Sequence, residues 1–187
     1  MNAAVADDVP GLLKLDLCCG IHKKEGFLGV DRRKFPGVDV ITDLRTPWPW
    51  SDGSAQEIHM SHALEHFSGV QRVHIFNEMY RVLVPQGKAT IITPHWSSNR
   101  AYCDFTHLWP PVSEMLYFYV SKKWRQDNAP DNDIEWNPRG YSCDFDATWG
   151  YGVRPDLLVR NQEYQMFALS NYKEAATDMI ATLVARK

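Results

Sequence analysis

Two short apolar runs near the start of the chain, each ending beside an acidic residue, decide the fold. Residues 13–20 read Leu-Lys-Leu-Asp-Leu-Cys-Cys-Gly, and residues 27–31 read Phe-Leu-Gly-Val-Asp. Gly20 marks a tight turn after the first run, because glycine lets the backbone approach a ligand without a Cβ in the way. The pattern predicts two neighbouring parallel strands that bring Asp16 and Asp31 to one edge of a sheet. Open α/β sheets bind their ligands at that edge; solvated acidic ends of two core strands are the alternative interpretation.

The connection between these two runs is unusually short. Only ten residues lie between Gly20 and Asp31, which is too few for a full helix and a strand. We therefore expect the first crossover helix to be very short or absent. Further apolar patterns predict strands over 38–42, 57–60, 88–93, 143–151 and 178–186, and helices over 71–83, 112–124 and 161–174. This order indicates an α/β domain with a mostly parallel sheet.

Composition narrows the class of protein. The chain has 187 residues and a net charge of −3, which suits one domain and argues against a general nucleic-acid binder. The basic runs 23–24 and 32–34 are interpreted as a solvated rim. Cysteines stand at 18, 19, 103 and 143 without a Cys-x-x-Cys pair, so we expect no zinc ribbon. We expect the thiols to be reduced and the protein to be cytoplasmic. Neither an apolar signal core in residues 1–10 nor a membrane-spanning run is predicted.

Five motifs in order resemble the class I S-adenosylmethionine-dependent methyltransferases. They are residues 14–20, 25–31, 38–44, 61–66 and 78–88, and a sixth piece, Asp-Phe-Thr-His at 104–107, looks like an Asp-Pro-Thr-His element. The best match is the bacterial type-11-like group with a shortened first helix. The resemblance implies a Rossmann-like α/β fold, with a seven-stranded sheet that is mostly parallel, an antiparallel last strand and helices on both faces. It also implies methyltransferase activity with S-adenosylmethionine as cofactor.

The resemblance carries a cofactor-binding set onto this sequence. Asp16 is expected to anchor the methionyl amine, Asp31 the ribose hydroxyls, and Asp43 with the Leu44 N–H the adenine. Gly20 and its neighbours approach the methionyl end, and His62 faces the reacting region. The full expected set is Asp16, Leu17, Cys18, Cys19, Gly20, Asp31, Arg32, Asp43, Leu44, Ser61 and His62. Cys18 and His22 occupy positions that favour glycine in the family, and this departure motivates a second hypothesis, a non-catalytic cofactor-binding partner subunit.

Candidate catalytic residues follow the fourth and fifth predicted strands. Methyl transfer demands alignment above all, and a base helps only where the acceptor must lose a proton. We expect His62, His95, Asp104 and His107 to serve at the acceptor side. In a second interpretation, residues 95, 104 and 107 only attach the following segment to the sheet. No metal site is predicted, because these residues form no tight ligand cluster in the sequence.

The single domain is expected to have three parts. Residues 12–94 form the cofactor-binding half, 95–160 an aromatic-rich insert or lid, and 161–187 a closing helix and strand. The aromatic side chains of the insert suit a planar, apolar or sugar acceptor. We therefore expect methyl transfer to a small molecule or a glycan. A nucleic-acid or protein acceptor is the less favoured alternative, no membrane partner is expected, and the oligomeric state stays open.

Overall fold

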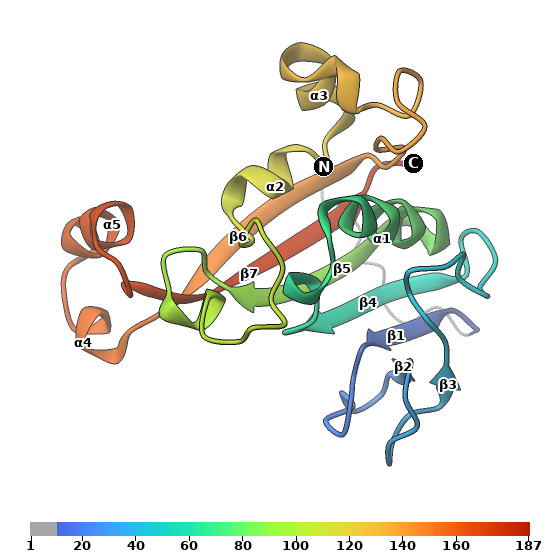
Figure 1. Ribbon diagram of the computed structural model, residues 1–187, viewed down its shortest axis with the longest axis horizontal. Helices are drawn as coiled ribbons and strands as arrows, with labels where there is room; N and C mark the ends of the chain where they lie inside the picture. The colour runs from blue at the N-terminus through green and yellow to red at the C-terminus, as the bar shows by residue number, and fades with distance from the viewer. Residues whose placement is uncertain (1–10) are drawn as a thin grey trace.

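A computed structural model describes residues 11–187, which form a seven-stranded sheet of order β3-β2-β1-β4-β5-β7-β6 (Figure 1). The strands are β1 (Leu13–Leu17), β2 (Leu28–Asp31), β3 (Val40–Ile41), β4 (Ala55–Ser61), β5 (Leu83–Pro94), β6 (Phe145–Val153) and β7 (Ala176–Ala185). Neighbours from β3 to β5 are parallel, and β7 runs antiparallel to both β5 and β6. The expected mostly parallel sheet with an antiparallel last strand is confirmed.

The connection between the first two strands contains no helix. Residues 18–27 form turns alone, and the loops from β2 to β3 and from β3 to β4 are also without a helix. The expectation of a very short or absent first crossover helix is confirmed. Three strand ends and their loops therefore lie together at one corner of the sheet, at the lower right of Figure 1.

Helices follow β4, β5 and β6. They are α1 (Gly69–Val82), α2 (Glu114–Phe118), α3 (Lys122–Asn128), α4 (Pro155–Leu158) and α5 (Gln162–Asn171), with 3-10 turns η1 (Leu64–His66), η2 (Asn99–Ala101) and η3 (Pro130–Asn132). The helix predicted over 112–124 is two short helices, because the Ser121 side chain accepts a hydrogen bond from the Trp124 N–H and starts α3. α4 and α5 lie beyond the ends of β6 and β7 (Figure 1).

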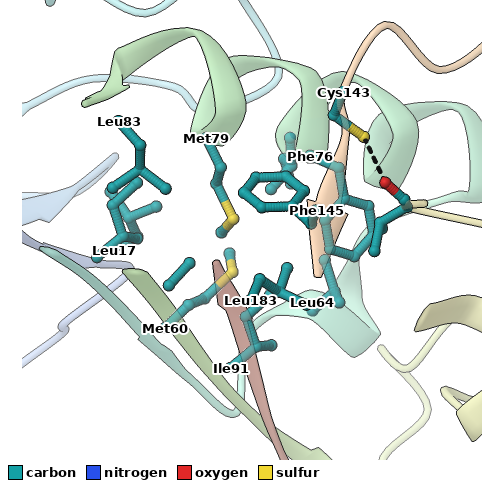
Figure 2. Packing of buried hydrophobic residues seen from close by; sticks show 14 of the residues in the cluster. Leu17, Met60, Leu64, Phe76, Met79, Leu83, Ile91, Cys143, Phe145 and Leu183 are labelled. Atoms are coloured by element: carbon teal, nitrogen blue, oxygen red, sulfur yellow. Dashed lines mark hydrogen bonds between the residues drawn. The ribbon is translucent and has the colours of Figure 1, made fainter. Parts of the chain in front are cut away.

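α1 begins at a capping box and presents an apolar stripe to the sheet. The Ser68 side chain accepts from the Gln71 N–H, and the Gln71 side chain accepts from the Ser68 N–H. The stripe packs on side chains of β4, β5 and β7, as Figure 2 shows. The fully buried members from both sides include Met60, Ile75, Phe76, Met79, Val82, Ile91 and Leu183. Each such side chain contributes about 1.5–3 kcal/mol by burial.

The opposite face of the sheet is more polar. Lys88, Asp146 and Ile180 point to that side and are exposed, so helical cover of this face is incomplete within residues 11–187. A solvated face is common for antiparallel strands such as β6 and β7, which carry Asp146 and Ile180. None of the helices in residues 11–187 has the length and apolarity needed to cross a bilayer.

Candidate functional site

A cleft of about 580 Å³ opens at the carboxyl ends of β1 to β4. Its size is in the usual range for small-molecule sites. Segments that follow four different strands line it, and two residues of the 95–160 segment close one side. The lining residues are Cys18, Asp31, Arg32, Arg33, Phe35, Thr42, Asp43, Leu44, Arg45, His62, Ala63, His66, Phe67, Gln71, Thr106 and Leu108.

Cys18 forms the bend at the floor of the cleft. Its φ of 56° lies in the left-handed region, where glycine is favoured, and Gly20 has a φ of 54°. The structure thus confirms that this position has the backbone conformation of a glycine. Burial, with the neighbouring Asp31 carboxylate, raises the pKa of the Cys18 thiol to about 12. The thiol is therefore neutral at physiological pH and is no nucleophile.

Two carboxylates stand at the ends of neighbouring strands. Asp31 accepts hydrogen bonds from the Gly20 N–H at 3.1 Å and from the Arg33 N–H at 2.9 Å. Asp43 accepts from the Arg45 guanidinium at 2.8 and 2.5 Å, and this pairing lowers the pKa of Asp43 to about 2. Both carboxylates are thus oriented by nearby donors and face the cleft.

Six of the eleven residues expected to bind the cofactor line this cleft: Cys18, Asp31, Arg32, Asp43, Leu44 and His62. The other five, Asp16, Leu17, Cys19, Gly20 and Ser61, do not line it. Asp16 is buried, and its two oxygens pair with the Lys24 N–H and the His59 ring, both at 2.7 Å. Asp16 therefore holds the β1–β2 loop in place.

His62 lies between two carboxylates at the other end of the cleft. Its Nδ1 is 3.7 Å from Glu65 Oε1, and its Nε2 is 3.9 Å from Asp178 Oδ1. The Glu65 carboxylate raises the pKa of His62 above its ordinary value. Asp178 also pairs with Arg100 at 2.7 Å. The imidazolium form of His62 is thus stabilised where the cleft meets β7.

Asp104 and His107 lie on one loop, and this loop contacts His66. Asp104 accepts hydrogen bonds from the N–H and the hydroxyl of Thr106, at 2.8 and 2.7 Å. The Thr106 hydroxyl is also 2.9 Å from Nδ1 of His66. The rings of His66 and His107 contact edge to face, with centroids 4.7 Å apart.

His95 lies apart from this group and does not line the cleft. Its side chain is buried, with Nδ1 2.8 Å from the Ser97 hydroxyl and Nε2 2.8 Å from Glu114. The Tyr151 hydroxyl donates to the same Glu114 carboxylate at 2.9 Å. These bonds connect α2 to β5 and β6, as in the interpretation in which residue 95 attaches the insert to the sheet.

The aromatic residues of the 95–160 segment do not gather in one pocket. Trp96 and Tyr102 line a second cleft of about 430 Å³ together with Tyr172 and Lys173. Tyr117 is fully buried against Phe76 and Trp149. Phe105 and Trp109 are 97% and 80% exposed. The periodicity of the sequence could not separate these environments.

Several residues of the site are not among those predicted from the sequence. Arg33, Phe35 and Arg45 line the cleft, and Glu65 and Asp178 flank His62. Arg45 has a local signal, because it stands two residues after Asp43 and can fold back on it. Asp178 has none, because the antiparallel pairing of β7 with β5 brings it there.

Comparisons with known proteins agree with this geometry. No family model matches the chain. An uncharacterised methyltransferase of Synechocystis is 25% identical in an alignment of 138 residues that covers 64% of this chain and 62% of that protein. The chain therefore matches less than two thirds of the length of that relative.

Solved structures share the whole architecture. A SAM-dependent methyltransferase from Archaeoglobus fulgidus matches with a TM-score of 0.65 and 16% identity, over 93% of this chain and 86% of that one. A geranyl diphosphate methyltransferase in complex with SAM matches with a TM-score of 0.50 and 15% identity, over 95% and 79%. The chain has the Rossmann-like fold of the S-adenosylmethionine-dependent methyltransferases.

Proposed function

We propose that this protein is an S-adenosylmethionine-dependent methyltransferase acting on a small-molecule or glycan acceptor, of the type-11-like group with a shortened first helix. The observation that carries the proposal is the position of Asp31. Asp31 stands at the end of β2 and lines the cleft, and the residue is 9% exposed. A carboxylate there can accept both hydroxyls of a ribose. The methyltransferase fold and the named relative support the same activity.

The cofactor would lie across the tips of the first three strands. In this arrangement Asp31 holds the ribose, Asp43 and Leu44 meet the adenine, and the backbone bend at Cys18 meets the methionyl end. Arg32 lines the same cleft. Asp16, Leu17, Cys19, Gly20 and Ser61 do not line it, and Gly20 orients the Asp31 carboxylate through its N–H. When bound, S-adenosylmethionine supplies an electrophilic methyl group on its sulfonium.

His62 is the proposed base for an acceptor that loses a proton. It lines the cleft, and the carboxylates of Glu65 and Asp178 stabilise the imidazolium that proton uptake forms. Thr106 and Leu108, from the 95–160 segment, border the same end. We assign no proton transfer to Asp104, His107 or His95, and His95 attaches the segment after β5 to α2 through Glu114.

Charge and size favour a small acceptor over a nucleic acid. The net charge of −3 opposes binding to a polyanion. The cleft of about 580 Å³ has room for the cofactor and a compact group beside it. The mouth of the cleft carries local positive charge, because three arginines line it: Arg32, Arg33 and Arg45.

Calorimetry of the full chain with S-adenosylmethionine and S-adenosylhomocysteine tests the proposal. We expect one site per chain with a dissociation constant at or below about 100 μM, which corresponds to a binding free energy of about −5.5 kcal/mol. Absence of binding at millimolar cofactor would refute it. Transfer of an isotope-labelled methyl group to pools of small hydroxy and amino compounds, oligosaccharides, RNA and proteins then separates the acceptor classes. Cofactor binding without transfer to any pool would favour the non-catalytic partner subunit.

A further inference from the structure

We propose that Glu65, His66 and His107 form a site for a divalent transition metal beside the acceptor end of the cleft. Each residue offers one ligand atom, and the three atoms lie within 4.8 Å of one another. Ligands of a tetrahedral zinc ion are about 3.4 Å apart, so movements of about 1 Å bring the side chains onto a metal. Two imidazoles and one carboxylate suit Zn²⁺ and Fe²⁺.

The Glu65 carboxylate lacks a partner that its burial requires. Its side chain is 5% exposed, and Oε2 accepts no hydrogen bond from any residue within 11–187. The other oxygen is 3.7 Å from the His62 ring, beyond hydrogen-bond distance. A buried carboxylate oxygen that accepts no hydrogen bond is costly. A metal ion at this point would satisfy it.

The buried guanidinium of Arg72 already makes its hydrogen bonds to other groups. It donates to the backbone carbonyls of Leu64, Glu65, Leu108 and Pro110, at 3.2, 3.4, 3.2 and 2.7 Å. None of these bonds reaches the Glu65 carboxylate. They instead hold η1, which carries Glu65 and His66, against the loop that carries His107. A hydrogen bond of 2.8 Å from the Leu108 N–H to the Glu65 carbonyl joins the same two segments. The three ligands are therefore on a preformed frame.

The hydrogen bonds of both rings leave Nε2 as the nitrogen with a lone pair. His107 Nδ1 is 3.1 Å from the Ala101 carbonyl, which only accepts, so Nδ1 carries the proton. The Thr106 hydroxyl donates to Asp104 and therefore accepts from Nδ1 of His66. This outer shell of carbonyl, hydroxyl and carboxylate is typical of metal-binding histidines. Asp104 is then a positioning residue for His66.

The site adjoins the cleft through His66, which contributes to both. Three protein ligands leave a coordination position for water or an acceptor oxygen. A metal there would polarise an oxygen held at that position. The metal site stands independently of the proposed methyl transfer, because its test needs no cofactor and no acceptor.

Metal titration of the chelator-stripped full chain tests the inference. We expect one Zn²⁺ or Co²⁺ per chain, and a Co²⁺ absorption spectrum of low-coordinate nitrogen and oxygen ligation. Glu65→Gln and His107→Gln should weaken binding more than 100-fold, and Asp104→Asn by about 10- to 100-fold, as loss of an outer-shell partner does. His22→Gln removes an exposed histidine outside the cluster and should leave binding unchanged.

His107→Cys separates ligation from folding. It keeps a ligand at the position, so Co²⁺ should still bind and show a new thiolate charge-transfer band. The circular dichroism spectrum of each variant confirms its fold. The inference is overturned if the stripped protein binds neither ion at one per chain, or if Glu65→Gln and His107→Gln bind as tightly as the unaltered chain.

Discussion

The backbone N–H of Gly20 donates a hydrogen bond of 3.1 Å to Oδ2 of Asp31. The bond connects the bend after β1 directly to the end of β2, with only turns between them. The Asp31 carboxylate is therefore oriented by the same bend that forms the floor of the cleft. A ligand that contacts the Asp31 carboxylate therefore depends on the Gly20 N–H for the orientation of that carboxylate.

Removal of the Asp31 charge should weaken cofactor binding. Asp31→Asn keeps the size of the side chain and loses the charge-assisted hydrogen bonds to a ribose, so we expect a 10- to 100-fold higher dissociation constant for S-adenosylmethionine, on the order of 1.5–3 kcal/mol. Calorimetry measures it. Asp146→Asn makes the same change at an exposed position of β6 and should have no effect. Equal affinities of the two variants would contradict the ribose assignment.

The backbone strain at Cys18 predicts an order among substitutions. Cys18→Gly removes about 1–2 kcal/mol of strain at φ 56° and loses a partly buried side chain, so the free energy of unfolding should change by less than about 1 kcal/mol. Cys18→Val places a β-branched side chain in the same conformation and should destabilise by about 2 kcal/mol or more. Urea unfolding measures both. A valine variant as stable as the glycine variant would show that the bend relaxes.

Substitution of Arg72 should lower the stability of the fold even when lysine keeps the positive charge. The side chain is 2% exposed and makes four hydrogen bonds to carbonyls of two chain segments. A lysine lacks the planar fork and leaves some of these carbonyls unpaired. We expect Arg72→Lys to lower the free energy of unfolding by about 2–4 kcal/mol. Arg139→Lys, at an exposed position, provides the control and should stay within about 0.5 kcal/mol.

The Glu114 carboxylate should make the free energy of unfolding depend on pH in the acidic range. Burial acts to raise its pKa, but hydrogen bonds from His95 and Tyr151 outweigh burial and hold the pKa at about 2, below the ordinary 4.5. The carboxylate therefore stabilises the fold above pH 4.5, by at most about 3 kcal/mol, and this contribution is lost as pH falls from about 4.5 toward 2.

Urea unfolding between pH 6 and pH 3 checks this dependence. Glu114→Gln should be less stable at pH 6 and should lose less stability on acidification than the unaltered chain. The exposed Glu135→Gln variant should follow the unaltered chain. Parallel curves for the Glu114→Gln variant and the unaltered chain would place the acid-sensitive group elsewhere.

Local patterns determined most of the sheet. The apolar runs before Asp16 and Asp31, and the ten residues that follow Gly20, were enough to predict parallel strands and a missing crossover helix. The stripe of α1 was visible because helical spacing needs only residues that are near in the sequence. The pattern predicts β5 over 88–93, and the strand extends from Leu83 to Pro94.

The site was predicted only in part, because its two ends differ in origin. The cofactor end is built from strand ends, so Asp31, Asp43 and Leu44 could be placed from their positions after apolar runs. The acceptor end is built from segments far apart in the chain. Asp178 lies near His62 because β7 pairs with β5. His107 lies near Glu65 because Arg72 donates hydrogen bonds to the carbonyls of both Glu65 and Leu108.

Residue patterns alone are enough to place the strands along the chain, their acidic ends and Cys18 at a position that favours glycine. The interior network of His95 and the grouping of Glu65, His66 and His107 become visible only in the folded chain. Hydrophobic periodicity acts within a few residues, whereas a buried carboxylate is satisfied by whichever donors the packing brings to it.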